Sequence, residues 1–307
     1  MGKKIKDPGL GNSSAQFAKR MINKDGSFNV VHVNKKRRFS EAYNFLIGIS
    51  WWQFFVLSFL SYIIANVFFA SIYFFIGIEE VTLSQRNVYK DFVNAFFFSA
   101  QTFTTLGYGA MAPKGMASGI VSSIEAFLGL MFFAFTTGLL YGRFSKPKAA
   151  IRFSKQIVFR EFRNGQALMF RIENNRNSTM IDPKVSVNLS LSKKNKKGEY
   201  VNDFYVLKLE RQTIRFLPTT WTLVHLVDKE SPLFEFSEET LLKQNGEFLV
   251  LVSYYDESFN QEVHQMYSYL ISDIKFNYGF VKAYYYNEKG EMVLDHKLFD
   301  CVESLKS

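Results

Sequence analysis

A run of six residues near the middle of the chain, Thr104 to Gly109 (TTLGYG), has the composition that a dehydrated cation requires of a protein. A cation that leaves water needs other oxygen atoms in place of its hydration shell, and a narrow loop supplies them when successive backbone carbonyls point inward. That backbone needs glycines, because residues with a Cβ avoid the dihedral angles involved. Gly107 and Gly109 meet this need. We predict that the ion is surrounded by the Thr105 hydroxyl and by the carbonyls of Thr105, Leu106, Gly107 and Tyr108.

The residues before this loop predict a short helix that enters the membrane without crossing it. The uncharged run of 22 residues from Phe92 to Pro113 is crowded with polar side chains and ends in glycines and a proline. Irregular backbone is not tolerated against lipid, so this run must be half helix and half loop, shielded by protein. We predict a pore helix over 92–103, whose negative C-terminal end favours a cation. A filter follows over 104–109, which Gln101 and Thr104 support.

Two long apolar segments flank this re-entrant run. Residues 42–78 carry no charge over 37 positions, and residues 115–142 carry Glu125 as the one charge among 28. A bilayer core needs about 20 apolar residues as a helix. The sequence therefore excludes a purely soluble enzyme and predicts an outer helix over 51–78 and an inner helix over 118–143. Residues 40–50 are either a helix on the membrane surface, which we favour, or the first turns of the outer helix.

Charge is distributed unevenly along the chain. The formal net charge is +9, and ten Lys or Arg residues precede residue 40. The segment between the first two uncharged runs, residues 79–91, has a net charge of −1, from Glu79, Glu80 and Asp91 against Arg86 and Lys90. By the positive-inside rule both termini lie in the cytoplasm, which requires an even number of crossings. We expect residues 1–39 to be a mobile cytoplasmic tail and expect no nucleic-acid partner.

The composition changes after Pro147. Residues 184–191 alternate with period two, and turn signals at Asn164-Gly165 and at 287–290 separate apolar runs. These patterns predict short strands joined by hairpins, and an all-β sandwich over 149–307. Cys301 is the only cysteine, and the four histidines lack metal-ligand spacing. We see no catalytic triad or phosphate loop, so we expect neither an enzyme nor a bound cofactor.

Several stretches of the chain resemble one protein family. The pore run AFFFSAQTFTTLGYG (95–109), the join TGLLYGRFSKPKA (137–149) and the stretch WTLVHLVDKESPL (221–233) are similar to inward-rectifier potassium channels, most of all to the prokaryotic KirBac branch. TLGYG resembles the TVGYG filter of potassium channels. The resemblance implies a K⁺-selective homotetramer, with K⁺ as the permeant ion. Each subunit would join a two-transmembrane-helix pore domain (40–148) to a cytoplasmic immunoglobulin-like β-sandwich.

Two filter-region residues depart from the common pattern of this family. Leu106 stands where Val or Ile is usual, but its side chain is expected to face away from the ions and to brace the loop, as is Tyr108. Gln101 stands where eukaryotic members carry Glu, which resembles the prokaryotic branch and implies a bacterial inner membrane.

The inner helix carries four further candidates. Gly129 resembles the family's hinge glycine, with close helix packing as an equal alternative. Phe133 and Tyr141 are predicted to form hydrophobic constrictions that gate the pore, unless they are lipid-facing or core aromatics. Glu125 is a charge inside a span, and we expect it to brace the filter loop through hydrogen bonds. A water-exposed position at the pore mouth is its alternative.

Charged residues outside the spans suggest regulation. The family resemblance implies binding of anionic lipid headgroups by Arg143, Lys146, Lys148 and Arg176, with topology-setting charge as the alternative. It also implies that Asp182 and Glu257 line a cytoplasmic vestibule that concentrates cations. Ordinary solvated acids are the alternative. Two other functions stay open: a weakly selective cation channel on the same scaffold, and a non-conducting membrane-anchored sensor.

Overall fold

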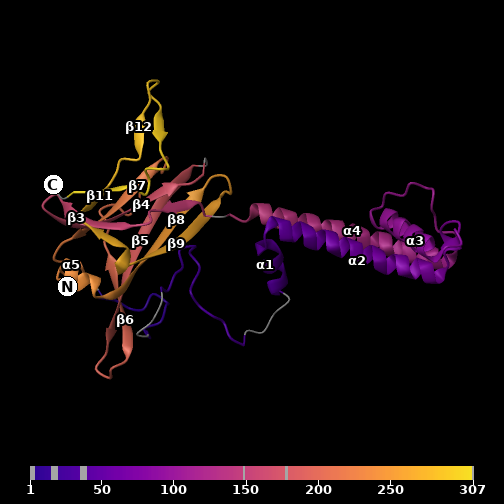
Figure 1. Cartoon of the computed structure of the whole chain (residues 1–307), viewed down its shortest axis with the longest axis horizontal. Coiled ribbons are helices and arrows are strands. Elements are labelled where there is room, and N and C mark those ends of the chain that lie inside the picture. The colour runs from indigo at the N-terminus through magenta and orange to yellow at the C-terminus, as the bar shows by residue number, and fades with distance from the viewer. Residues whose placement is uncertain (1–3, 15–19, 35–39, 148, 177–178, 306–307) are drawn as a thin grey trace. The chain divides into compact units, whose positions relative to one another are not determined.

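The protein is described here by a computed structural model that covers residues 4–14, 20–34, 40–147, 149–176 and 179–305. The chain divides into two compact units. The first consists of residues 34–146 and is helical, and the second joins residues 1–33 to residues 147–307 and is built mainly of strands (Figure 1). The division agrees with the sequence, in which the long apolar runs end before Pro147.

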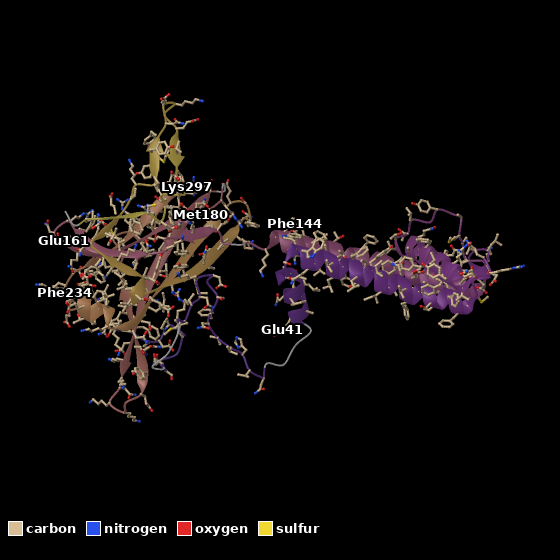
Figure 2. The ribbon with its side chains drawn as sticks, viewed as in Figure 1. Glu41, Phe144, Glu161, Met180, Phe234 and Lys297 are labelled. Carbon is tan, nitrogen blue, oxygen red and sulfur yellow. The ribbon has the colours of Figure 1, made fainter. Side chains whose placement is uncertain are left out.

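Two helices of the first unit are long and apolar enough to cross a membrane. Helix α2 (Trp51–Ile76) has 26 residues and helix α4 (Met116–Ser145) has 30. At 1.5 Å per residue they measure about 39 and 45 Å, more than the roughly 30 Å of a hydrocarbon core. Most of their side chains point outward (Figure 2), as in helices that face lipid or other subunits.

Shorter helices stand at the ends of these two. Helix α1 (Ser40–Gly48) is separated from α2 by Ser50, whose hydroxyl accepts the Gln53 amide at 3.3 Å while the Gln53 side chain accepts the Ser50 amide. This reciprocal cap begins α2 afresh at Trp51, so residues 40–48 are a helix of their own. The 3₁₀ turn η1 (Ile78–Glu80) follows α2.

Helix α3 (Val88–Phe103) lies between α2 and α4 in the sequence and packs on both. It begins four residues before the predicted start at 92, because the Asn87 side chain caps it by accepting the Lys90 amide at 3.2 Å. The fully buried Ala70 and Ala95 leave space for the rings of Tyr73 and Phe98, whose centroids lie 4.8 Å apart, edge to face.

The second unit is a sandwich of two sheets. One has the strand order β1-β6-β5-β8-β9, and the other has the order β10-β3-β4-β2 with β7 also paired to β4. A single cluster of buried apolar residues draws on both sheets, including Met180, which Figure 2 labels among the packed side chains. The strands are β1 (Lys4–Ile5), β2 (Ile151–Phe153), β3 (Ile157–Phe162), β4 (Gly165–Asn174), β5 (Met180–Lys194), β6 (Tyr200–Leu207), β7 (Thr220–Val227), β8 (Asn245–Asp256), β9 (Gln261–Leu270) and β10 (Ile274–Phe276).

Smaller elements complete this unit. They are α5 (Glu238–Leu242), the turn η2 (Ile271–Asp273), and the strand pairs β11 (Tyr278–Phe280) with β14 (Val302–Ser304) and β12 (Tyr284–Tyr286) with β13 (Met292–Leu294). Figure 1 shows β12 extending from the body of the sandwich.

The predicted hairpins form with small corrections. The loop between β3 and β4 is Arg163-Asn164, one residue earlier than predicted, because Arg163 takes the left-handed conformation (φ 54°) and Gly165 already pairs with Phe162. The apolar run before the predicted turn at 287–290 divides into two short strands, β11 and β12. The alternation in β5 is as predicted, with Val185, Val187 and Leu189 buried.

The N-terminal segment corrects the sequence-based expectation of a mobile tail. Strand β1 pairs antiparallel with β6, and the amides of Met21 and Ile22 donate to the buried Glu247 carboxylate at 2.6 and 3.2 Å. Ile22 is buried against Phe204 and Leu249. These apolar side chains, spaced singly among polar residues, give too weak a pattern to predict docking, yet they fasten the described parts of residues 4–30 to the sandwich.

Candidate functional site

The candidate site is the loop that leaves the C-terminal end of α3. Its first amides bond back to the last carbonyls of the helix: Thr104 to Ala100 at 3.1 Å, Thr105 to Thr102 at 3.0 Å and Leu106 to Gln101 at 2.9 Å. The Thr104 hydroxyl also donates to the Ala100 carbonyl at 2.7 Å. Gln101 and Thr104 therefore support the start of the loop, Gln101 through its backbone carbonyl.

The backbone conformation of the loop alternates. Thr105, Gly107 and Gly109 have positive φ angles of 57°, 52° and 84°, whereas Leu106 and Tyr108 between them do not. The two glycines tolerate this conformation, but it is unusual for a β-branched residue, and strain of this kind concentrates at functional sites. Thr105 is thus the one residue of the alternation whose type does not favour its conformation.

The side chains of Leu106 and Tyr108 are largely exposed in the single chain. Leu106 is 55% and Tyr108 74% exposed in the single chain. That these two side chains brace the loop therefore stays a prediction for the assembled protein.

Glu125 lies at the centre of a buried polar cluster. It is fully buried and accepts hydrogen bonds from the Tyr73 hydroxyl at 2.6 Å and from the Ser99 hydroxyl at 2.5 Å. Ser99 is also 3.1 Å from the Asn66 side-chain oxygen. The cluster joins α2, α3 and α4, one helical turn before the filter. This burial contradicts a water-exposed mouth position, and the bonds reach the pore helix, whereas we expected them to reach the filter loop itself.

Sequence reasoning missed the partners of Glu125. Tyr73, Ser99 and Asn66 lie on other helices, so no local pattern links them to it. The one signal available was the charge itself, because a carboxylate inside a span must have hydrogen-bond donors.

Gly129 lies directly against the end of the pore helix. A Cβ built on Gly129 overlaps the carbonyl oxygen of Phe103 and lies 2.8 Å from its carbonyl carbon. Helix α4 runs uninterrupted through this position. The geometry gives the close-packing alternative a specific contact.

Arg143, near the C-terminal end of α4, is engaged with α1 and α2. Its guanidinium donates to the carbonyls of Leu46 at 2.6 Å, Ile47 at 3.1 Å and Ile49 at 2.8 Å. The first two carbonyls belong to the last turn of α1, and the third lies just beyond it. It also lies over the rings of Trp51 and Phe54, 4.6 and 4.8 Å from their centroids. The structure thus gives Arg143 partners different from the predicted lipid headgroup.

Phe133 and Tyr141, the predicted constrictions, are 49% and 74% exposed in the single chain. The neighbouring Phe132 instead turns toward Phe103, with ring centroids 5.6 Å apart. Successive residues of α4 therefore divide between packing on the pore helix and facing away from it.

The comparisons with known proteins decide the family. A family model described as inward rectifier potassium channel C-terminal domain matches residues 151–307, and one described as ion channel matches residues 46–146. The chain is 32% identical to the inward rectifier potassium channel Kirbac3.1 of Paramagnetospirillum magnetotacticum over 90% of this chain and 93% of that one. The chain belongs to the inward rectifier potassium channel family.

This inward rectifier is also similar to mammalian relatives. It is 28% identical to the mouse G protein-activated inward rectifier potassium channel 2, over 85% of this chain and 66% of the relative. The predictions of a prokaryotic-type inward rectifier, of a two-helix pore domain with a β-sandwich, and of a K⁺ channel rather than an enzyme are confirmed.

The predicted regulatory residues of this inward rectifier lie in varied settings. Lys146 is exposed at the end of α4, and Lys148 lies outside the described residues. Arg176 pairs with the buried Asp256 at 3.6 Å and lies over the Phe259 ring. Asp182 sits at a bulge of β5 with φ 47° and pairs with Arg215 at 2.9 Å, and Glu257 is exposed.

Proposed function

We propose that four copies of this chain assemble around Thr105, Leu106, Gly107, Tyr108 and Gly109 and conduct K⁺ passively between their carbonyls. The observation that carries this proposal is the alternation of left-handed dihedral angles at Thr105, Gly107 and Gly109, which turns successive carbonyls to one side. One chain supplies one wall of such a filter, so a ring of carbonyls requires a symmetric homotetramer. Neighbouring subunits then cover Leu106 and Tyr108.

The pore closes at the inner helices in this proposal. The side chains of Phe133 and Tyr141 on α4 are exposed in the single subunit. Rings of four such side chains narrow the pore to an apolar constriction that loses its water and stops ions. Gly129 keeps α4 against the pore helix, and the family's hinge remains its alternative role.

Anionic lipids act at the cytoplasmic end of α4. Lys146 is exposed there, and Lys148 follows two residues later. Each basic residue near an anionic surface contributes about 1 kcal/mol of attraction. Arg143 is left out of this site because α1 occupies its donors, and Arg176 because it already faces Asp256. Asp182 and Glu257 line the cytoplasmic vestibule.

The protein is a multi-pass protein of the bacterial inner membrane with both termini in the cytoplasm. This proposal rests on the two candidate spans and on the excess of Lys and Arg before residue 40. Two crossings with the re-entrant helix between them return the chain to the side on which it began.

Cation flux into liposomes that contain the purified protein tests the proposal. We expect K⁺ uptake that Ba²⁺ blocks, with little Na⁺ uptake. Equal uptake of both ions would leave a weakly selective cation channel, and no uptake with or without anionic lipid would leave a membrane-anchored sensor.

A further inference from the structure

A junction behind the outer end of the filter joins three segments of the pore unit. They are η1 at the end of the outer helix, the return loop over residues 110–115, and the first turn of α4. The Lys114 amide donates to the Glu80 carbonyl at 2.8 Å, and the Ala112 amide donates to the Val81 carbonyl at 3.2 Å. The return loop is therefore bonded to the last residue of η1 and to the residue that follows it, through amides five and three residues after Gly109.

The Glu80 side chain adds a third connection, to α4. Its Oε2 accepts the backbone amide of Ser118 at 3.3 Å, one of the first-turn amides that have no partner inside the helix. A carboxylate at this end also interacts favourably with the positive end of the helix dipole. Ser118, fully buried, completes the cap by accepting the Gly115 amide at 3.2 Å.

Gly115 provides the space that the carboxylate occupies. A Cβ built on Gly115 would overlap the two carboxylate oxygens and the carboxyl carbon of Glu80. Gly115 has an ordinary φ of −102°, so its backbone does not require glycine. A side chain at residue 115 would therefore have to displace the Glu80 carboxylate from this position.

The junction rests on buried apolar side chains. Ile78 and Val81, on either side of Glu80, are 6% and 1% exposed, and Met111 of the return loop packs against the same cluster. The neighbouring Glu79, by contrast, is exposed. Glu80 is thus held between two buried side chains, with its carboxylate directed at α4.

We propose that Glu80 is a positioning residue for the outer end of the selectivity filter. It acts through the packing of its carboxylate against Gly115 and its hydrogen bond from the Ser118 amide. Five residues separate Gly109 from Gly115, so movement of residue 115 reaches the outermost filter carbonyls directly. The inference rests on the proposed function of the filter. It adds that ion selectivity depends on the Glu80 side chain, which accepts the Ser118 amide behind the filter and does not line the filter itself.

The test is a double-mutant cycle between Glu80→Ala and Gly115→Ala, with Glu80→Gln as the conservative variant and Glu79→Ala as the matched control. Each protein is placed in liposomes, and the ratio of K⁺ to Na⁺ uptake and the rate of Ba²⁺ block from outside are measured. A role in stability alone would lower the unfolding temperature without changing either quantity.

We expect Glu80→Ala to lower the K⁺/Na⁺ ratio at least threefold and Glu79→Ala to leave it unchanged. Glu80→Gln should keep most of the ratio, because its amide oxygen still accepts the Ser118 amide. Gly115→Ala should reproduce Glu80→Ala, because the new methyl group displaces the carboxylate. The double variant should have a K⁺/Na⁺ ratio no lower than that of either single variant. Alanine at residue 115 also changes the N-terminal cap of α4, but this effect is the same with and without Glu80 and therefore cancels in the cycle.

An unchanged ratio in Glu80→Ala, or independent, multiplying effects of the two substitutions, would overturn the proposal. If Glu80→Ala does not assemble, the comparison of Gly115→Ala with Glu80→Gln still decides, since only the first displaces the carboxylate. If the unaltered protein conducts nothing, the proposed function fails. The contact between Glu80 and Gly115 is then tested by the same double-mutant cycle, with the unfolding temperature as the measured quantity. Additive effects of the two substitutions on that temperature would refute the contact.

Discussion

The α-carbon of Gly129 in the inner helix lies against the backbone carbonyl of Phe103, the last residue of the pore helix. A Cβ at residue 129 would lie 3.1 Å from the Phe103 Cα and would overlap its carbonyl oxygen. Backbone cannot step aside as a flexible side chain can. This contact sets how closely α4 approaches the end of α3, the helix from which the TTLGYG loop begins.

Substitution of Gly129 by Ala should therefore disturb the filter. Overpacking of this kind costs about 1–3 kcal/mol, and we expect a lower unfolding temperature of the protein together with reduced K⁺ uptake in liposomes. Gly119 lies in the same helix with no atom within 4 Å of its built Cβ, so Gly119→Ala is the matched control. Equal behaviour of the two variants would contradict the packing role.

The cluster around Glu125 should behave as one unit. Glu125→Ala leaves the Tyr73 and Ser99 hydroxyls without their acceptor, and each buried unsatisfied group costs about 1–3 kcal/mol. Tyr73→Phe and Ser99→Ala should each cost less, and each should cost almost nothing further in the Glu125→Ala background. Thermal unfolding of the protein in detergent measures all of these variants. Strictly additive losses would show that the three residues act independently.

The contacts of Arg143 separate a structural role from a lipid role. Arg143→Met removes the donors that bind Leu46, Ile47 and Ile49, so we expect faster amide hydrogen exchange in α1 and an altered K⁺ flux in every lipid mixture. Lys146→Met should change only the dependence of flux on anionic lipid. If Arg143→Met instead loses only that dependence and leaves α1 protected, the headgroup role is the correct one.

The sandwich should lose stability in mild acid through His225. Burial lowers the pKa of His225 below its ordinary 6.5. Two weaker effects raise the pKa: the hydrogen bond between Nδ1 and the Lys208 carbonyl, at 2.8 Å, and the negative charge of Asp228. The unfolded chain takes up a proton below about pH 6.5 that the folded chain refuses, so stability is full above this pH and falls below it.

This pH dependence can be measured on the full chain. The unfolding temperature of the sandwich transition should fall between pH 7.5 and 5.5, and His225→Gln should show a smaller fall. The exposed His264 gives the control, since His264→Gln should keep the full dependence. Identical slopes for all three proteins would exclude His225 as the group responsible.

Much of the fold follows from local patterns. The apolar runs contain α2 and α4, and the period-two alternation of residues 184–191 lies within β5, because burial of one face or of a whole segment leaves a periodic trace. The TTLGYG run likewise carries its glycines at 107 and 109, where the backbone is left-handed. In all of these the physical cause lies within a few residues of the effect.

What the sequence could not provide are contacts between distant residues. The hydrogen bonds of Arg143 to the end of α1 join residues nearly 100 positions apart. The Glu247 carboxylate accepts amides of the N-terminal segment from more than 200 positions away. In the sequence Glu80 is one of several charges between the apolar runs, and nothing near it predicts that its carboxylate occupies the space that Gly115 leaves. Such pairs have no period and no spacing, so they emerge only when the chain is folded.

The most direct test of the account compares two versions of residue 107 in the filter. L-alanine at this position disfavours the left-handed φ of 52° by about 1–2 kcal/mol, whereas D-alanine, introduced by semisynthesis, adopts it without strain. We predict that the channel with D-alanine keeps the K⁺/Na⁺ flux ratio of the unaltered protein and that Gly107→Ala loses selective flux. Equal ratios for the two versions would contradict the claim that this backbone conformation selects K⁺.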